Sequence, residues 1–378
     1  MIHFRHLLIC LFLALIHSAA AGQLTLQIYG LPGTTHENSS VFVAGNFNGW
    51  NPGDQAYRFQ REAGGLFQLT LPLSAPFDLE FKLTQGSWQS VEGDPTGAFL
   101  PNRRYSYSGG LDTLRMKIES WELLDPNPRS TAGPNVKVVS TDFRMPQLGR
   151  QRRIWICLPS NYESSSQRYP VLYMNDAQNL FDAASSFSGE WKVDETVAQW
   201  SGRGFIVVGI ENGGENRIDE YSPWPHPKYG GGQGDEYAAF LVQTLKPFID
   251  KNYRTLKSRR NTGIMGSSMG GLIALYTAVE YQNTFGFAGV FSPSLWFSDQ
   301  WTGHVQYKGK KRPVLFYLLA GVNESETMAK DVWLLAKALE DAGFPASSIA
   351  VDIDGDGAHS EWFWAREFPL AVDWWLNR

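Results

Sequence analysis

The stretch Gly263–Gly271, which reads GIMGSSMGG, places Ser268 between two glycines where one pattern gives way to another. An apolar run that predicts a buried strand, Thr262–Met265, precedes it, and an apolar helical pattern, Gly271–Glu280, follows it. We expect a sharp turn that strains the backbone of Ser268, with glycine two residues to either side because side chains there would collide with the strand and the helix. Such a turn exposes the serine hydroxyl and aims the backbone N–H of Met269, at the positive end of the helix, into the same space.

Strand and helix patterns alternate from Asn135 to the end of the chain. Several strands are continuous apolar runs, as expected for parallel strands covered on both faces. With the serine turn in the middle, the alternation predicts an α/β domain over residues 135–378, with the doubly wound, mostly parallel sheet of an α/β-hydrolase. The expected strands are Lys137–Ser140, Arg153–Leu158, Pro170–Met174, Phe205–Ile210, Thr262–Met265, Phe287–Phe291, Val314–Leu319 and Ile349–Ile353, and the expected helices are Val193–Trp200, Glu236–Tyr253, Gly271–Glu280, Met328–Ala342 and Phe363–Trp375.

Residues 23–124 carry a different pattern, of short apolar or alternating segments separated by Gly, Asn and Pro. No helical periodicity appears there, so we expect a small all-β, immunoglobulin-like sandwich. The segment 125–134 has three prolines in ten residues, which predicts a stiff linker before the α/β domain. The strands of the sandwich are expected at Leu24–Ile28, Val41–Ala44, Phe67–Leu71, Phe77–Leu83 and Thr113–Ile118.

Residues 1–22 have the pattern of a secretory signal peptide. Arg5 gives a positive start, Leu7–Ile16 is apolar, and Ser18–Ala21 offers small residues for cleavage near Ala21. The apolar run is too short for an ordinary membrane span, so we expect cleavage and a secreted or periplasmic protein. The alternative is an uncleaved anchor. No other stretch could cross a bilayer, and no membrane span is expected after cleavage.

The formal net charge is −5, and removal of residues 1–22 takes away one arginine and no acidic residue. Nucleic acid and anionic membranes are therefore not expected as partners. Of the two cysteines, Cys10 leaves with the signal segment, so no intrachain disulfide is expected. Cys157 lies in a strand pattern and is interpreted as a small buried apolar residue rather than a nucleophile.

A serine hydroxyl needs a base within hydrogen-bond reach to act as a nucleophile, and in this fold the chain order is serine, acid, histidine. After Ser268 only two of the seven histidines remain, His304 and His359. His304 lies in what reads as a polar loop. His359 follows the strand Ile349–Ile353, at the carboxyl end where ligands bind in open α/β sheets. We therefore predict that His359 is the general base.

The acid that orients the imidazole should follow the preceding strand, Val314–Leu319. Glu324 is the first candidate and Glu326 the second. Glu324 could instead be a carboxylate that stabilises a helix N-terminus, and a Ser–His pair without an acid is a further alternative. For the oxyanion hole we expect two backbone donors, the N–H of Met269 and that of Gln178 in the loop after the strand Pro170–Met174.

Taken together, these motifs resemble the putative-esterase family of α/β-hydrolases, which includes enterobactin-type siderophore esterases, feruloyl and acetyl-xylan esterases, esterase D and mycolyltransferases. The resemblance covers residues 135–378 and is specific because several motifs occur in order. The motifs are Tyr169–Asp182, Gly189–Trp191, Val208–Gly213, Asn216–Arg217, Glu220–Tyr221, Gly266–Gly271 and Gly357–Trp364.

The resemblance implies Ser268, His359 and Glu324 as the catalytic triad. It also makes four residues of the other motifs candidates for substrate binding. Family members usually read Asp-Gly where this chain has Asp176–Ala177. Arg217 could hold an anionic or catechol-bearing substrate, or it could form a surface salt bridge with Glu220. The four candidates are Asp176, Trp191, Arg217 and Tyr221.

The segment Val41–Pro52, with residues 80–83 and 86–88, resembles the glycogen- and starch-binding modules attached to many carbohydrate enzymes. The resemblance implies that Trp50, Trp88 and Lys82 face a sugar, and aromatic faces do stack on sugar rings. The chain departs from that pattern at Arg103–Tyr107, where such modules usually carry an asparagine that contacts the sugar. The alternative is a sandwich that only docks on the catalytic domain.

We expect no cofactor and no metal. The run from Asp352 to Gly357 copies the first half of a calcium loop, with an aspartate at every second position. The glutamate required at the twelfth position of that loop is Phe363 here, and the segment follows a strand rather than a helix.

The sequence therefore predicts an exported serine esterase that acts through an acyl-enzyme on a small-molecule or polysaccharide ester. An acyl- or feruloyl-decorated carbohydrate is favoured by the sugar-module resemblance, and a catecholate siderophore trilactone is the alternative. A non-catalytic carbohydrate-binding protein on a hydrolase fold and an acyltransferase are further alternatives.

Overall fold

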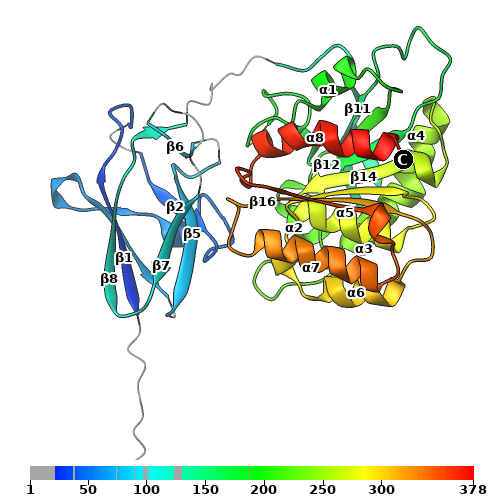
Figure 1. Cartoon of the computed structure of the whole chain (residues 1–378). Helices are drawn as coiled ribbons and strands as arrows, with labels where there is room; N and C mark the ends of the chain where they lie inside the picture. Colours follow the sequence, from blue (N-terminus) through cyan, green and yellow to red (C-terminus); the bar gives the residue numbers. More distant parts are fainter. Residues whose placement is uncertain are drawn as a thin grey trace, which may run out of the picture. The chain divides into compact units, whose positions relative to one another are not determined.

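A computed structural model of the chain describes residues 22–378 except 37–38, 74, 89, 96, 98–99, 101, 123–129 and 187 (Figure 1). Of the predicted signal segment and linker, only Gly22 and residues 130–134 lie within this described part. The chain divides into two compact units, one up to Leu124 and one from Asp125 onward. Among the helices of the described part, none is both long enough and apolar enough to span a membrane.

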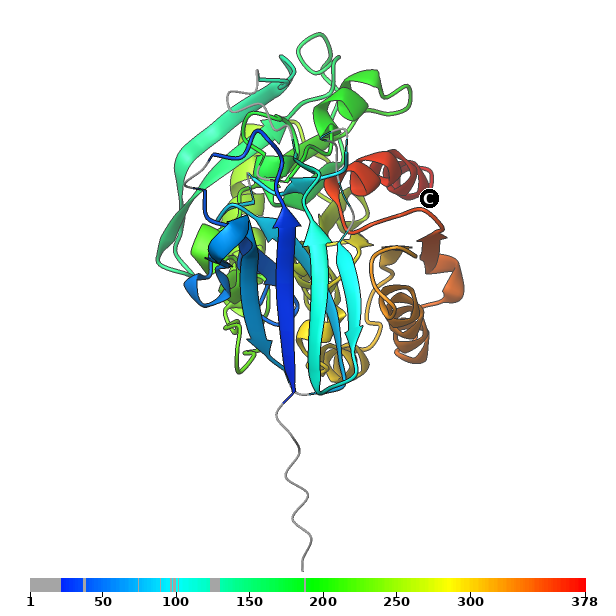
Figure 2. The same cartoon turned by 90° about the vertical axis from the view of Figure 1, so that its left-hand side faces the viewer.

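The first unit is an all-β sandwich, as predicted, with β1 and β8 pairing in parallel at the front of Figure 2. One sheet has the order β3-β4-β1-β8, and the other has the order β2-β5-β7. Alternate residues of β1, from Leu24 to Ile28, point into the core between the sheets, where they pack with Phe81 and Leu83. The strands are β1 (Gln23–Gly30), β2 (Phe42–Gly45), β3 (Gln60–Arg61), β4 (Phe67–Pro72), β5 (Phe77–Thr84), β6 (Glu92–Gly93), β7 (Arg103–Tyr107), β8 (Leu111–Lys117) and β9 (Ser120–Trp121).

The second unit is built on one eight-stranded sheet with the order β10-β11-β13-β12-β14-β15-β16-β17. β11 runs antiparallel to both of its neighbours, β10 and β13. The other six strands, β12 to β17, are parallel to one another. This is the mostly parallel α/β sheet that the sequence predicts. Its strands are β10 (Val136–Met145), β11 (Arg150–Cys157), β12 (Val171–Asn175), β13 (Ile206–Ile210), β14 (Thr262–Ser267), β15 (Phe287–Phe291), β16 (Leu315–Gly321) and β17 (Ile349–Asp354).

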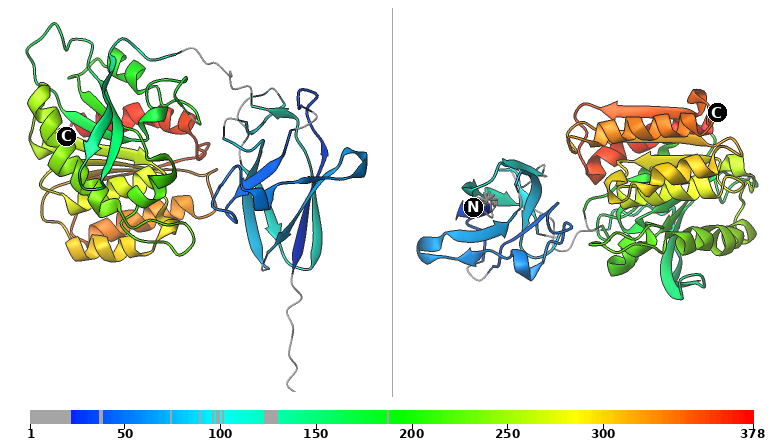
Figure 3. Two further views of the ribbon diagram at one scale, coloured as in Figure 1. Left: turned by 180° about the vertical axis from the view of Figure 1, so that it is seen from behind. Right: turned by 90° about the horizontal axis from the view of Figure 1, so that it is seen from below.

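Helices cover both faces of this sheet (Figures 1 and 3). Val171 and Tyr173 of β12 pack with α3 to α7 on one face, whereas Leu172 and Met174 pack with α1 and α8 on the other. Both faces are apolar, which explains the continuous apolar runs in the sequence. The helices are α1 (Val193–Gln199), α2 (Arg217–Glu220), α3 (Gly234–Phe240), α4 (Lys246–Asn252), α5 (Met269–Glu280), α6 (Gln300–Lys308), α7 (Met328–Asp341) and α8 (Glu361–Leu376).

Two helix predictions need correction. The continuous helix expected over Glu236–Tyr253 is interrupted by a π-helical turn, Leu241–Leu245, between α3 and α4. Pro247 lies in the first turn of α4, and its missing N–H cannot continue the α-helical hydrogen bonds through that point.

His304 lies in α6, and the prediction of a polar loop there is wrong. The imidazole packs against Tyr276 and Trp224, with ring centroids 4.6 and 5.9 Å away. Burial lowers the pKa of His304 to about 4, so the ring is neutral at pH 7. The sequence shows no apolar helical pattern there because only Trp301 and Val305 of the nine residues of α6 are buried.

Candidate active site

Ser268 stands at the turn between β14 and α5, and its backbone has φ 57° and ψ −124°. This conformation is strained for any residue other than glycine, as the sequence predicts. The turn is tight because a Cβ at Gly266 would lie 2.6 Å from the carbonyl oxygen of Gly270. A Cβ at Gly270 would in turn lie 2.9 Å from a carboxylate oxygen of Asp176. Glycine at both positions lets the strand, the helix and the β12 loop approach one another.

The Ser268 hydroxyl lies 3.1 Å from Oγ of Ser294, a residue of the loop after β15. Backbone contacts reinforce this pairing, because the N–H of Ser294 donates to the carbonyl of Ser268. Met269 is the first residue of α5, so its N–H belongs to the helical turn that lacks intrahelical acceptors. These groups form a polar surface around the half-buried hydroxyl of Ser268.

Nδ1 of His359 lies 2.8 Å from Oε2 of Glu324. The Glu324 side chain is 1% exposed and that of His359 is 31% exposed, so the acid is buried behind a partly accessible imidazole. Glu326, the second candidate for the acid, is exposed. Of the two glutamates, the structure therefore brings Glu324 to the histidine.

The other carboxylate oxygen of Glu324 accepts two hydrogen bonds, from the N–H of Gly321 at 2.6 Å and from Oγ of Ser292 at 2.7 Å. Ser292 in turn accepts a hydrogen bond from Nε1 of Trp364 at 2.8 Å. The Trp364 ring meets the His359 ring edge to face, with centroids 5.0 Å apart. Ser292 thus contacts Glu324, Trp364 contacts His359, and the two are joined to each other by a hydrogen bond. The sequence alone does not identify Ser292, although its place directly after the strand Phe287–Phe291 is a signal for a residue at the edge where sites form.

The loops that carry Glu324 and His359 approach closely at two further glycines. A Cβ at Gly321 would lie 2.2 Å from the backbone of Gly357, so no side chain fits there. The N–H of Asn323 also donates to the carbonyl of Gly357 at 2.9 Å. This contact joins the ends of β16 and β17 and fixes the distance between the loops of Glu324 and His359.

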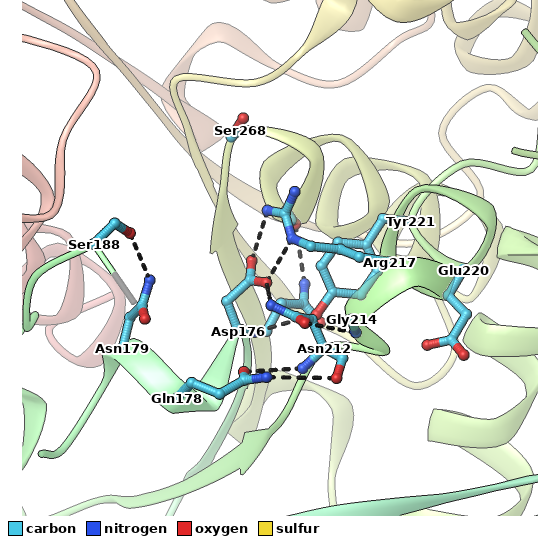
Figure 4. A network of polar contacts seen from close by, with 12 residues as sticks. Asp176, Gln178, Asn179, Ser188, Asn212, Gly214, Arg217, Glu220, Tyr221 and Ser268 are labelled. Atoms are coloured by element: carbon cyan, nitrogen blue, oxygen red, sulfur yellow. Dashed lines mark hydrogen bonds and ion pairs between the residues drawn. The ribbon is translucent and has the colours of Figure 1, made fainter. Parts of the chain in front are cut away.

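A second polar network follows β12 and β13 (Figure 4). Asp176 has left-handed backbone angles, φ 57° and ψ 49°, and its carboxylate accepts two hydrogen bonds from Arg217 at 2.7 and 3.0 Å. Nδ2 of Asn212 donates to the same carboxylate at 2.7 Å. Burial favours the neutral form of Arg217, but Asp176 outweighs this effect and raises the pKa of the guanidinium above its ordinary value. Arg217 is therefore a paired cation.

The alternative of a surface salt bridge between Arg217 and Glu220 is wrong. Glu220 is fully buried and pairs with Arg150 and Arg152 at 2.8 and 2.7 Å. In Figure 4 its carboxylate points away from the guanidinium of Arg217. The sequence spacing places the two residues one turn apart on one short helix, α2, but Glu220 is buried and takes other partners.

Gln178 lies in the short 3₁₀ turn Ala177–Asn179 that follows Asp176. Its side-chain oxygen accepts a hydrogen bond from the N–H of Asn212 at 3.0 Å, which ties the β12 loop to the β13 loop. The turn that carries the Gln178 N–H is thus held by the Asp176 network on one side and by Asn212 on the other.

The structure does not support direct substrate contacts for two of the four binding candidates. Trp191 is 3% exposed and stacks on Phe291 with centroids 5.6 Å apart. Tyr221 is fully buried, and its hydroxyl accepts a hydrogen bond from the N–H of Asp176. Both predictions of substrate contact are corrected to supporting roles beneath the site, because neither ring reaches the surface.

Glu361 is a buried carboxyl two residues beyond the imidazole. Its Oε1 accepts hydrogen bonds from Nδ2 of Asn179 at 2.9 Å and from Oγ of Ser188 at 2.5 Å. Burial raises the pKa of Glu361 to about 7, against smaller lowering effects from Ser188 and His359. The group therefore changes charge near neutral pH close to the predicted base.

In the first unit, the rings of Trp50 and Trp88 lie 6.4 Å apart at an interplanar angle of 34°, and both are partly exposed. Lys82 does not present its charge at the surface, because it is 6% exposed and lies 3.6 Å from Glu122. The prediction that Lys82 faces a sugar is therefore corrected, whereas the two tryptophans remain available to one ligand.

The run of aspartates from Asp352 to Asp356 is not organised as an ion site. Asp354 and Asp356 both pair with the guanidinium of Arg366, at 2.8 and 2.7 Å. Asp352 accepts a hydrogen bond from the Tyr317 hydroxyl at 2.7 Å. A neighbouring cation already neutralises the charges that a calcium ion would need.

Comparison with known proteins identifies the fold and the family. The chain is 25% identical over 236 residues to the protein YbbA of Bacillus subtilis, a match that covers 59% of this chain and 92% of YbbA. It is 23% identical over 233 residues to an endo-1,4-beta-xylanase/feruloyl esterase of Xylanibacter ruminicola, covering 59% of this chain and 29% of that protein. Among solved structures, the enterobactin esterase FES of Shigella flexneri superimposes with a TM-score of 0.53 at 18% identity, over 89% of this chain and 88% of that one.

The likeness to the FES structure shows a shared fold, and it extends over more residues than the second unit contains. Residues 145–361 match the family described as "Putative esterase", which is more than half of the chain. The matched range contains the Ser268 turn, Glu324 and His359. The chain belongs to this esterase family of α/β-hydrolases and is an ester hydrolase.

Proposed function

We propose that this protein is an exported serine esterase in which Ser268 is the nucleophile, His359 the general base and Glu324 the acid that orients it. The observation that carries the proposal is the 2.8 Å contact between His359 and the buried Glu324, beside the strained turn of Ser268. A carboxylate at Nδ1 leaves Nε2 as the nitrogen that takes the proton.

The convergence of Ser268 on His359 is supported by the loop after β15. Ser292 contacts the acid, and Ser294, two residues along, contacts the nucleophile. The strands that carry the three groups are β14, β16 and β17, and β15 lies between the first two of these. Parallel strands end at the same edge of the sheet, so the three side chains share one rim.

In the proposed reaction, Oγ of Ser268 attacks the ester carbonyl while His359 takes the hydroxyl proton. The oxyanion is stabilised by the N–H groups of Met269 and Gln178. Collapse of the tetrahedral intermediate expels the alcohol, which takes the proton from His359, and leaves an acyl-enzyme. Water then attacks the acyl carbonyl while His359 removes its proton, and collapse of this second intermediate releases the carboxylic acid as His359 returns the proton to Oγ of Ser268.

For the substrate, we propose an acyl- or feruloyl-decorated carbohydrate. The similarity to a xylanase/feruloyl esterase and the paired rings of Trp50 and Trp88 both favour a carbohydrate ester. Near the nucleophile, Trp296 is 56% exposed, and its ring meets that of Tyr229 with centroids 5.9 Å apart. Trp296 is two residues from Ser294 in sequence, and its exposed ring suits an aromatic acid or a sugar ring. The signal-peptide pattern of residues 1–22 supports an activity outside the cytoplasm.

A siderophore trilactone is the second candidate substrate. The fold shared with the FES enterobactin esterase over 89% of this chain favours it. The pairing of Arg217 with Asp176 weighs against it, because the guanidinium already has a carboxylate partner and is a poorer anchor for a catecholate. We therefore place the carbohydrate ester first.

Hydrolysis of p-nitrophenyl acetate by the wild type and by Ser268→Ala tests the proposal. We expect the substitution to lower kcat by at least about 10³-fold. Equal rates would instead support a carbohydrate-binding protein on a hydrolase fold. Feruloyl, acetyl-xylan and catecholate-lactone esters assayed side by side would rank the substrate classes. Product analysis with an added alcohol or sugar acceptor would distinguish hydrolysis from acyl transfer.

A further inference from the structure

We propose that Glu190, Asp194 and Glu195 form a binding site for one calcium ion, away from the proposed catalytic triad. One carboxylate oxygen from each residue lies within 4.8 Å of one from each of the others. Oxygen ligands on a single Ca²⁺, at about 2.4 Å from the ion, are separated by at most about 4.8 Å. This site departs from our sequence expectation of no metal, and it is distinct from the run of aspartates before His359.

Each of the three residues keeps one buried oxygen that no donor in the described part of the chain satisfies: Oε1 of Glu190, Oδ1 of Asp194 and Oε2 of Glu195. Asp194 is only 1% exposed, so water does not compensate its charge. A buried carboxylate oxygen without a partner is costly, and three neighbouring carboxylates that each keep one such oxygen favour a positively charged ligand.

The remaining oxygens of two of these residues are held by hydrogen bonds from the start of the second unit. The N–H of Gly133 donates to Oδ2 of Asp194 at 2.7 Å, and the hydroxyl of Thr131 donates to Oε2 of Glu190 at 3.0 Å. These bonds fix the two carboxylates and leave their other oxygens available. The site is therefore ordered by its own surroundings before an ion arrives.

Nearby charges do not neutralise the cluster. Lys192 acts weakly on Glu190, while Asp182 adds further negative charge. Among the ion pairs of the described residues, none involves the three acids of the cluster. A proton shared between the carboxyl groups is the competing occupant of the cluster.

The donor set selects the kind of cation. All three ligands are carboxylates, which suit hard cations, and no histidine or cysteine contributes to the cluster. Ca²⁺ accepts six to eight oxygens in flexible geometry, so solvent and nearby carbonyl groups can complete its shell. Mg²⁺ demands a stricter octahedron and releases water reluctantly, so we expect weaker binding of Mg²⁺.

The ion would brace a loop that supports the catalytic residues. Trp191 lies between the ligands in sequence, and its ring packs on Phe291 and Trp364. Trp364 in turn packs on His359. Calcium at this position would stabilise the fold without taking part in the reaction, so its main effect should be on the melting temperature.

Binding is measured on the full chain after treatment with EDTA and gel filtration. Terbium is the optical probe, because tryptophan excitation sensitises its emission and Trp191 is adjacent to Glu190 in sequence. We expect one Tb³⁺ per chain, displaced by Ca²⁺ more readily than by Mg²⁺. Millimolar Ca²⁺ should raise the melting temperature by several degrees, because the ion binds only the folded chain.

Two variants make the test specific. Glu195→Gln, at a half-buried position, should lower the affinity for Ca²⁺ at least about tenfold and clearly reduce the calcium-dependent shift in melting temperature. Asp356→Asn, in the acidic run paired with Arg366, should bind Ca²⁺ like the wild type. The proposal would be overturned by a wild type without a calcium-dependent shift, or by equal shifts in wild type and Glu195→Gln. It would also be overturned if Glu195→Gln stabilised the protein at pH 8 whether or not calcium was present, because the cluster would then hold a proton.

Discussion

Nδ1 of His359 lies 2.8 Å from Oε2 of Glu324, and the glutamate is buried while the imidazole reaches solvent. The glutamate is itself fixed by Gly321 and Ser292, so it cannot turn away from the ring without losing two hydrogen bonds. An acid held in this way fixes the tautomer and the orientation of the base.

Replacement of each glutamate in the loop after β16 should show which of the two orients the imidazole. Glu324→Gln keeps the shape but loses the charge that stabilises the imidazolium, and we expect kcat to fall by about 10²- to 10⁴-fold. Glu326→Gln, at an exposed position, should leave kcat within about twofold of the wild type. Steady-state kinetics on p-nitrophenyl acetate provides the measurement. Comparable losses in both variants, or a loss only at 326, would refute the assignment.

Ser292→Ala should lower both stability and activity. The change leaves the buried Nε1–H of Trp364 without its acceptor and removes one donor from Glu324. An unsatisfied buried donor costs about 1–3 kcal/mol of unfolding free energy. Urea denaturation measures this loss, and Ser164→Ala, at an exposed hydroxyl, is the matched control. A Ser292→Ala variant as stable as that control would show that the network contributes little.

Glu361→Gln should change how stability depends on pH. The folded-state pKa of about 7 lies above the ordinary value, so the folded chain retains a proton that the unfolded chain releases between about pH 4.5 and 7. The unfolding free energy of the wild type should therefore fall through this window, by up to about 3 kcal/mol from this group. The glutamine variant lacks this titration, so its advantage over the wild type should grow with pH.

Urea unfolding of both proteins at pH 5 and pH 8 gives the comparison for Glu361, with Glu163→Gln at an exposed position as the control. If the difference between wild type and Glu361→Gln stays constant with pH, the carboxyl is already ionised at pH 5 and the prediction fails.

Arg217→Lys should impair the loop that carries the proposed second oxyanion donor, Gln178. Lysine keeps the charge but cannot make the two parallel hydrogen bonds that Arg217 makes to Asp176. The left-handed turn of Asp176 should loosen, and we expect kcat to fall about tenfold because the N–H of Gln178 is misplaced in the transition state. Arg203→Lys, at an exposed position, is the control. Unchanged kcat in Arg217→Lys would exclude the second network from catalysis.

The sheet and the serine turn could be predicted from the sequence because their signals are local. Apolar runs fix the strands of a sheet covered on both faces, and the glycines at 266 and 270 mark a close approach that only this turn requires. Both the fold class and the contact between His359 and Glu324 agree with what chain order implies for such a sheet.

Side-chain pairings across loops could not be predicted in the same way. Arg217 lies near Glu220 in sequence, yet in the folded chain Arg217 forms an ion pair with Asp176. Glu220 instead pairs with Arg150 and Arg152. The role of Ser292 depends on Glu324 and Trp364, which are separated from it by 32 and 72 residues. Such partners depend on how the loops after neighbouring strands pack together, and no periodic pattern in the sequence predicts them.

The most direct test of the central claim is to label the protein with a fluorophosphonate and to locate the adduct by peptide mass spectrometry. A serine activated by His359 should react once per chain, at Ser268, and Ser268→Ala and His359→Ala should remain unlabelled. Labelling at another residue, or equal labelling of the wild type and Ser268→Ala, would contradict the account.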